Sequence, residues 1–121
     1  MPTVGQLVMH RRRDGGRQTL VLEGELDLVT APDLEDTVAA LCLGGARQLV
    51  LDMRRVAFID SSGLRTILAS MDMCAQNGCE FLLIPGNGAC LRLFELTGMI
   101  DDLPLREADE LAEPPAAARG T

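Results

Sequence analysis

"FIDSSGLRTIL", residues 58–68, decides the fold, because a strand ends and a helix begins within it. A short apolar run stops at Asp60, and two serines and a glycine follow it. Apolar residues then recur at helical intervals of three and four: Leu64, Ile67, Leu68, Met71, Cys74 and Ala75. A strand followed directly by a helix places Ser61 and Ser62 at the carboxyl edge of a sheet, where functional groups gather in such folds.

Similar patterns on either side predict the remaining elements. The expected strands are residues 4–9, 19–22, 48–53, 56–59 and 81–85, with a possible edge strand at 103–105. A turn is expected at residues 14–16. Further helices are expected after Thr30, which suits an N-cap, and over residues 91–96, with Gly98 as a left-handed C-cap. The order β-β-α-β-α-β-α-β predicts an α/β fold with a mixed sheet of four to five strands and helices packed on it.

The length of 121 residues fits one domain, which we expect to cover residues 1–106. Residues 107–121 are acidic and then rich in proline and alanine, which predicts a flexible tail. The composition of residues 107–112, the first part of this tail, is compatible with a short helix.

Net charge argues against nucleic acid as a partner. The formal charge is −7 and the sequence pI about 4.5, whereas binding to a phosphate backbone needs a basic surface. The one dense basic run, residues 10–13, precedes the expected turn and is interpreted as solvated. There is neither a signal-peptide pattern nor an apolar run near the roughly 20 residues of a membrane span. We therefore expect a cytoplasmic protein with no membrane partner.

The four cysteines are Cys42, Cys74, Cys79 and Cys90, and their spacing matches no zinc or redox motif. Each has apolar or helical neighbours, where a free cysteine packs as a small hydrophobic residue. The expectation is four reduced core thiols, with no metal and no cofactor.

Ser61 and Ser62 have three candidate roles: catalytic nucleophile, helix cap and target of modification. A hydrolase nucleophile elbow needs a glycine two residues before its serine, and the chain has Ile59 and Asp60 at those places. The sole histidine, His10, lies beside the arginine run, so no base is expected near the serines. One serine is expected to cap the helix. The other can be a phosphorylation target, whose added charge the helix N-terminus tolerates.

The helix after the serines has a second face opposite its apolar stripe. It comprises Ser62, Thr66, Ala69 and Met73, with Arg65 beside them. Small residues and an adaptable methionine suit a docking surface. A second helix packed over the same face explains the pattern equally well.

Three blocks of the sequence, residues 22–34, 49–68 and 93–99, resemble the signature of STAS-domain anti-sigma factor antagonists. They read "LEGELDLVTAPDL", "LVLDMRRVAFIDSSGLRTIL" and "LFELTGM", and the resemblance covers residues 3–106. It implies a non-enzymatic bacterial regulator. In such proteins a partner kinase of the histidine-kinase-like ATPase type, itself the anti-sigma factor, phosphorylates the serine after the motif aspartate. The unphosphorylated antagonist binds that kinase and frees a sigma factor, and a metal-dependent serine phosphatase resets the switch.

Carried onto this chain, the resemblance makes Ser61 the phosphoacceptor. It also implies partner-binding roles for two groups of residues. The first is Asp60, Ser62, Gly63 and Leu64 at the start of the helix. The second is Gly24, Glu25, Asp27 and Thr30 in the other motif loop. We add Arg65, Thr66, Ala69 and Met73 from the second helix face. The same fold also serves as an accessory or sensor domain in transport, lipid-trafficking or nucleotide-responsive complexes, which is the alternative function.

Overall fold

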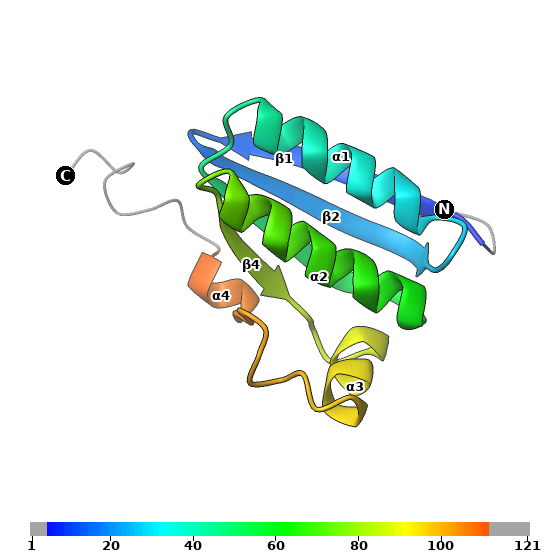
Figure 1. The fold of residues 1–121 in the computed structure, drawn as a ribbon. Helices are drawn as coiled ribbons and strands as arrows, with labels where there is room; N and C mark the ends of the chain where they lie inside the picture. The colour runs from blue at the N-terminus through cyan, green and yellow to red at the C-terminus, as the bar shows by residue number, and fades with distance from the viewer. Residues whose placement is uncertain (1–4, 112–121) are drawn as a thin grey trace.

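The computed structural model of the protein describes residues 5–111. Its sheet has the strand order β1-β2-β3-β4 (Figure 1). The strands are β1 Leu7–Asp14, β2 Arg17–Leu26, β3 Gln48–Ile59 and β4 Glu80–Ile84. The helices are α1 Ala31–Leu43, α2 Ser61–Gln76, α3 Ala89–Leu96 and α4 Ala108–Leu111. Because β1 is antiparallel to β2 while β2, β3 and β4 are parallel, the predicted α/β class and mixed sheet are confirmed.

The hairpin of β1 and β2 is longer than predicted. The arginine run lies inside β1 and is exposed there, whereas the sequence suggested that it borders the turn. An edge strand tolerates this, since charged side chains on an edge also discourage pairing with another chain. The turn itself is where it was expected, and Gly15 has the positive φ of 63° that the turn requires. The predicted start of β1 at residue 4 lies outside the described residues.

β3 is one continuous strand, where the sequence predicted two short ones. Arg54 and Arg55 interrupt the apolar pattern but not the strand, because β3 pairs with β2 along nearly its whole length. Arg54 is also satisfied in place, since its guanidinium donates to both carboxylate oxygens of Asp52, with Nε–Oδ1 at 2.9 Å and Nη2–Oδ2 at 2.6 Å.

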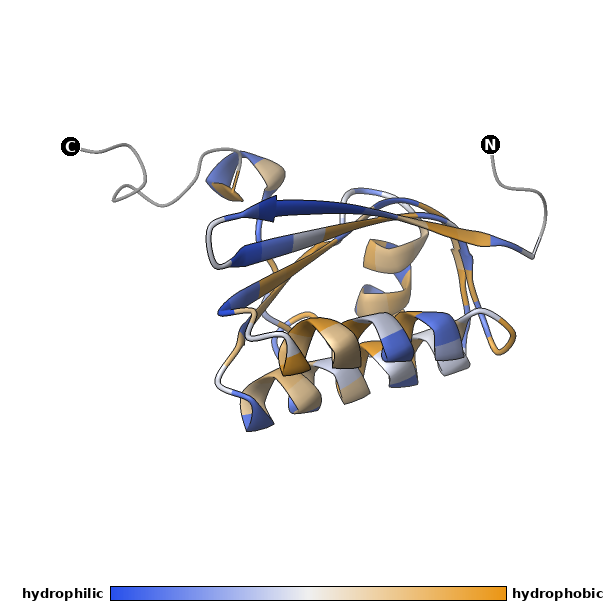
Figure 2. Cartoon of the chain, turned by 90° about the horizontal axis from the view of Figure 1, so that it is seen from above, coloured by the Kyte–Doolittle hydropathy of each residue, from blue (hydrophilic) through white to orange (hydrophobic). Residues whose placement is uncertain are grey.

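Two helical layers cover the sheet. α1 and α2 lie side by side on one face and α4 lies on the other (Figure 2). The main core between the sheet and α1, α2 and α3 includes Leu20, Leu22, Leu34, Val38, Leu49, Leu51, Ile67 and Phe94. On the opposite face Val50, Leu82 and Ile84 are buried against Ala108 and Leu111 of α4. β3 and β4 are therefore apolar on both faces, and their nearly continuous apolar runs are typical of buried parallel strands.

The C-terminal region departs from the predicted edge strand. Residues 103–105 make one isolated parallel bridge, Leu83 with Leu105, instead of a strand. Pro104 explains this, because it has no N–H to donate to a ladder, although its carbonyl accepts from the N–H of Leu83 at 3.0 Å. The predicted tail helix is present in part as α4, and residues 112–121 lie outside the described part of the chain.

α3 begins two residues earlier than predicted, at Ala89, and Gly98 follows it with φ of 73° as expected of a left-handed cap. Over residues 5–111, no helix has the length and apolar character that crossing a bilayer requires.

Candidate functional site

Ser61 stands at the junction that the sequence indicated. β3 ends at Ile59, Asp60 follows, and Ser61 is the first residue of α2. The side chain of Ser61 is exposed, and its hydroxyl makes no hydrogen bond with the described residues. A free hydroxyl at the N-terminus of a helix is accessible to another protein.

The helix cap is Asp60 and not a serine, which corrects the sequence-based expectation. Oδ1 of Asp60 accepts the N–H of Gly63 at 3.0 Å, and its backbone is extended, with φ −117° and ψ −171°. A carboxylate at this place satisfies a free amide and also meets the positive end of the helix dipole. Ser61 is thereby left without a structural role in the cap.

Ser62 differs from its neighbour. It is half-buried, and its Oγ accepts from Nη2 of Arg65 at 3.3 Å across the first turn of α2. Arg65 itself is exposed. Of the two hydroxyls, Ser62 is engaged and Ser61 is free.

Gly63 is buried where the first turn of α2 presses on the end of β2. A Cβ built on it would lie 2.6 Å from the carbonyl oxygen of Leu26 and 2.8 Å from Cγ1 of Ile59. Atoms do not approach that closely, so the contact between α2 and the end of β2 requires glycine. This contact fixes Ser61 next to the loop between β2 and α1.

The end of β2, which leads into that loop, contains Gly24, whose φ is 119°. A Cβ there would meet the carbonyl oxygen of Gln6 at 2.2 Å, so no other residue fits. The same carbonyl accepts the N–H of Glu25 at 2.8 Å, and the Glu25 carboxylate accepts the N–H of Gly5 at 2.9 Å. Gly24 and Glu25 therefore tie the end of β2 to the chain before β1.

Asp27 and Thr30 hold the loop between β2 and α1. Oδ1 of Asp27 accepts the N–H groups of Val29 and Thr30 at 3.0 and 3.1 Å. The Thr30 hydroxyl donates to the carbonyl of Glu25 at 2.8 Å and accepts the N–H of Asp27 at 3.0 Å. Thr30 occupies the predicted N-cap position of α1, but its side chain makes no cap bond because these contacts occupy it. The Thr30 side chain is also buried, so it supports the loop from the interior of the protein.

The expected second face of α2 is largely covered by α1, which favours the covering-helix explanation. Thr66 is buried and donates its hydroxyl to Oε2 of Glu35 at 2.9 Å. Ala69 is half-buried, and Met73 packs against the main core. Leu64, assigned by its spacing to the core stripe, is only partly buried.

Exposed apolar side chains lie at the edge of the sheet that carries Ser61, and sequence reasoning did not single them out. Leu28 and Val29 are 71% and 78% exposed in the loop after β2, and Phe58 is 48% exposed near the end of β3. The pairing of Leu26 with Ile59 brings both segments to the same edge of the sheet. The sequence did contain a signal for two of them, because Leu28 and Val29 are adjacent apolar residues between the polar Asp27 and Thr30.

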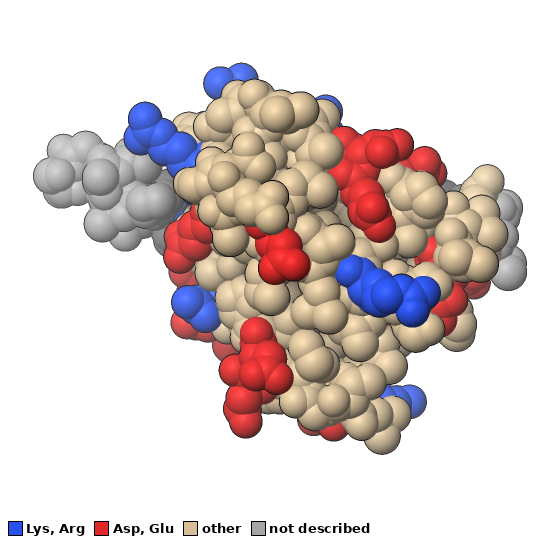
Figure 3. Space-filling model, in the orientation of Figure 1, with Lys and Arg blue, Asp and Glu red and all other residues tan. Residues whose placement is uncertain are grey.

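Charge around the site is mixed. Figure 3, which views the helical side, shows arginines scattered among acidic groups rather than gathered into one broad basic area. The described ion pairs lie elsewhere: Asp52 with Arg54, and His10 with Glu23 at 3.1 Å. His10 belongs to the outer strand β1 and faces Glu23, so it is in no position to act as a base for Ser61.

Comparison with known proteins supports the resemblance found in the sequence. The model of the STAS domain family matches residues 11–112. The anti-sigma-B factor antagonist of Staphylococcus aureus (strain NCTC 8325 / PS 47) is 31% identical over 88 residues, which are 73% of this chain and 82% of that protein. The crystal structure of an anti-sigma factor antagonist from Mycobacterium paratuberculosis has a TM-score of 0.76 at 28% identity, covering 94% of this chain and 95% of that one.

The fold alone is also shared with the unphosphorylated form of the anti-sigma factor antagonist SpoIIAA. That structure has a TM-score of 0.72 at 18% identity and covers 94% of this chain and 98% of that one. The anti-sigma factor antagonists are regulators and not enzymes. By its sequence, its fold and its Asp-Ser-Ser-Gly-Leu junction, the chain belongs to the STAS-domain family of anti-sigma factor antagonists.

Proposed function

We propose that this protein is a partner-switching antagonist whose state is set by phosphorylation of Ser61. In the proposal, the unphosphorylated chain binds an anti-sigma factor that is also a serine kinase of the histidine-kinase-like ATPase type. Binding frees a sigma factor, as in a bacterial stress response. A metal-dependent serine phosphatase removes the phosphate, and the exchange takes place in the cytoplasm, where the kinase finds ATP.

The observation that carries the proposal is the division of labour between Asp60 and Ser61. Because Asp60 caps α2, the Ser61 hydroxyl is exposed and unengaged. Adding a phosphate there removes no contact among the described residues. A phosphoserine brings a charge of about −1.5 to −2, which a helix N-terminus accommodates. The fold should therefore survive the modification, and its effect should fall on the surface.

The surface beside Ser61 is suited to a protein partner. Leu28, Val29 and Phe58 are exposed apolar groups at the same edge, and an interface core depends on such anchors. We assign contact with the kinase to these side chains, to Ser62 and Arg65, and to the first turn of α2. Gly24, Glu25, Asp27 and Thr30 act by holding the loop that presents Leu28 and Val29.

Phosphate at Ser61 would place about two negative charges beside the Asp60 carboxylate, in the middle of this surface. Like charges juxtaposed in an interface cost several kcal/mol, and about 1.4 kcal/mol is already tenfold in affinity. Release of the kinase follows from the added charge and bulk, with no change of fold.

Incubation with ATP and the candidate kinase, followed by peptide mapping of the added phosphate, tests the modification. Phosphate is expected on Ser61, absent from the Ser61→Ala variant and retained by Ser62→Ala. Phosphate confined to Ser62, or none at all with an active kinase, would overturn the assignment.

A further inference from the structure

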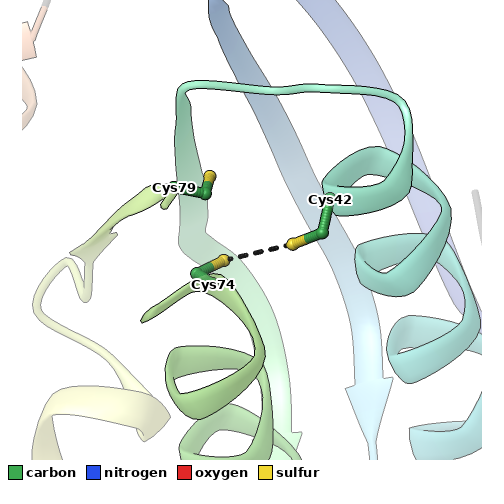
Figure 4. Close-up of side chains that lie close together, drawn as sticks. All are labelled: Cys42, Cys74 and Cys79. Carbon is green, nitrogen blue, oxygen red and sulfur yellow. Dashed lines mark hydrogen bonds between the residues drawn. The ribbon is translucent and has the colours of Figure 1, made fainter. Parts of the chain in front are cut away.

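Three of the four cysteines meet at the end of the molecule opposite Ser61. Cys42 lies in the last turn of α1, Cys74 in the last turn of α2, and Cys79 directly before β4 (Figure 4). Their sulfur atoms all lie within 4.8 Å of one another, and those of Cys42 and Cys74 are 3.7 Å apart. The expectation of reduced, buried thiols holds for each residue alone, but their grouping exceeds what packing as small hydrophobic residues requires.

The geometry suits a single bound ion. Three sulfurs bonded at about 2.3 Å to one pyramidal trivalent centre, with bond angles near about 95°, lie roughly 3.4 Å from one another. The cluster therefore needs shifts of about 1.4 Å or less. Among residues 5–111 no histidine or carboxylate completes the group. The nearby carbonyls of Cys42 and Cys74 already accept the N–H groups of Gly45 and Cys79, at 3.1 and 2.9 Å. The donor set is three sulfurs.

The surroundings oppose negative charge. All three thiols are buried, and a charge in a buried site is costly unless it is compensated. Cys42 and Cys74 both lie at helix C-termini, whose partial negative charge disfavours a thiolate. A zinc ion with three thiolates would leave one net negative charge here and would lack the fourth ligand of a structural site.

We propose that Cys42, Cys74 and Cys79 form a three-sulfur binding site for a trivalent, thiol-binding metalloid of the arsenite class. Arsenous acid supplies three hydroxyl groups. Three As–O bonds and three S–H bonds break, three As–S bonds form, and each thiol proton leaves with a hydroxyl group as water. Arsenic stays trivalent, no electron is transferred, and the product is neutral. A buried site favours a neutral ligand, because burying an uncompensated charge is costly.

A route to the site exists at Cys79. This residue lines a surface hollow of about 420 Å³ together with Met71 and Phe81. Once bound, the ion would join the ends of α1 and α2 to the start of β4. Because a ligand that binds the folded state more tightly than the unfolded chain stabilises the fold by mass action, arsenite should raise the melting temperature.

Native mass spectrometry of the reduced full-length chain with sodium arsenite tests the site. One arsenic atom per chain is expected, with the loss of three protons and a rise in melting temperature. Cys42→Ala and Cys79→Ala should each lose the bound arsenic. Cys90→Ala is the matched control, since Cys90 is equally buried but lies outside the cluster, and it should bind as the parent does.

Circular dichroism establishes which variants fold, and having two variants keeps the test decisive if one of them does not. Failure of the folded parent to bind arsenite would overturn the proposal. So would one arsenic atom retained by folded Cys42→Ala, which would mean a two-sulfur site. Tighter binding of Zn²⁺ than of arsenite would overturn the choice of a trivalent ion.

Discussion

Residue 63 must be glycine because of the atoms that surround it and not because of its backbone angle. Its φ is not positive, so conformational freedom is not the reason for glycine. The carbonyl oxygen of Leu26 and the side chain of Ile59 leave no room for a Cβ. The Asp-Ser-Ser-Gly-Leu sequence thus assigns one task to each of three residues: Asp60 caps, Ser61 is free, and Gly63 permits the close contact with β2.

Replacing Gly63 with alanine should destabilise the fold by about 1 to 3 kcal/mol, because overpacking forces backbone or side-chain shifts. Urea unfolding followed by circular dichroism measures the change. Gly88→Ala is the control, since nothing lies within 4 Å of a Cβ there, and its effect should stay below about 1 kcal/mol. Equal effects of the two substitutions would show that the contact with Leu26 is not tight.

At the scale of elements, α2 depends on Asp60 for its start. Asp60→Ala should lower the free energy of unfolding by about 1 kcal/mol, while Asp60→Asn should retain most of the stability because an amide oxygen can also accept the N–H of Gly63. The measurement is thermal or urea unfolding. Asp72→Ala, an exposed change in the middle of the same helix, serves as the control and should not destabilise. If Asp60→Ala proved as stable as the parent, the cap would have to be supplied by a serine after all.

Helices and buried strands were predictable because their apolar spacing is regular, as in β4 and in the stripe of α2. The cap was not, since Asp60 and both serines are suitable cap residues and sequence alone does not rank them. The covering of Thr66 by α1 was equally hidden, because it depends on the packing of two helices and on Glu35. The extent of β3 was missed because Arg54 finds Asp52 within its own strand.

Across the whole molecule, the two proposed sites lie at opposite edges. The carboxyl ends of β2 and β3 carry Ser61 and the exposed Leu28 and Val29, and the opposite end carries the three thiols. The sequence predicted the first edge from a strand-to-helix junction. It could not predict the second, because Cys42 and Cys74 are 32 residues apart and meet only when α1 packs beside α2.

Two exposed apolar residues, one at each edge, allow the two edges to be tested separately. Val29→Ser should weaken binding to the kinase by about 1 to 2 kcal/mol, as loss of an interface anchor does. Leu43→Ser, which is 83% exposed at the other end of α1, should leave binding unchanged. Calorimetric titration of each variant checks this, and neither change should alter stability beyond about 0.5 kcal/mol. Equal losses of affinity would place the interface elsewhere.

The sheet also contains a pH-dependent contribution to stability. Burial alone would raise the pKa of Asp52, but the hydrogen bonds and charge of Arg54 outweigh it and lower the pKa below the ordinary 3.8. A depressed carboxyl pKa stabilises the fold above the unfolded-state value, and the contribution disappears as the pH falls through the folded-state value.

Arg54→Gln should therefore reduce the free energy of unfolding at pH 7, and the difference from the parent should shrink below about pH 4, as Asp52 becomes protonated. Urea unfolding at both pH values measures it. Arg11→Gln, on the exposed part of β1, is the control. A loss that stayed constant from pH 7 to pH 3 would mean that Arg54 acts through packing alone.

The dissociation constant between the kinase and this protein, measured before and after phosphate is added to Ser61, tests the central claim most directly. The account predicts at least about a tenfold weaker complex after modification, with the circular dichroism spectrum unchanged and with Ser61→Ala binding as tightly as the unmodified chain. An affinity that is the same in both states would contradict it.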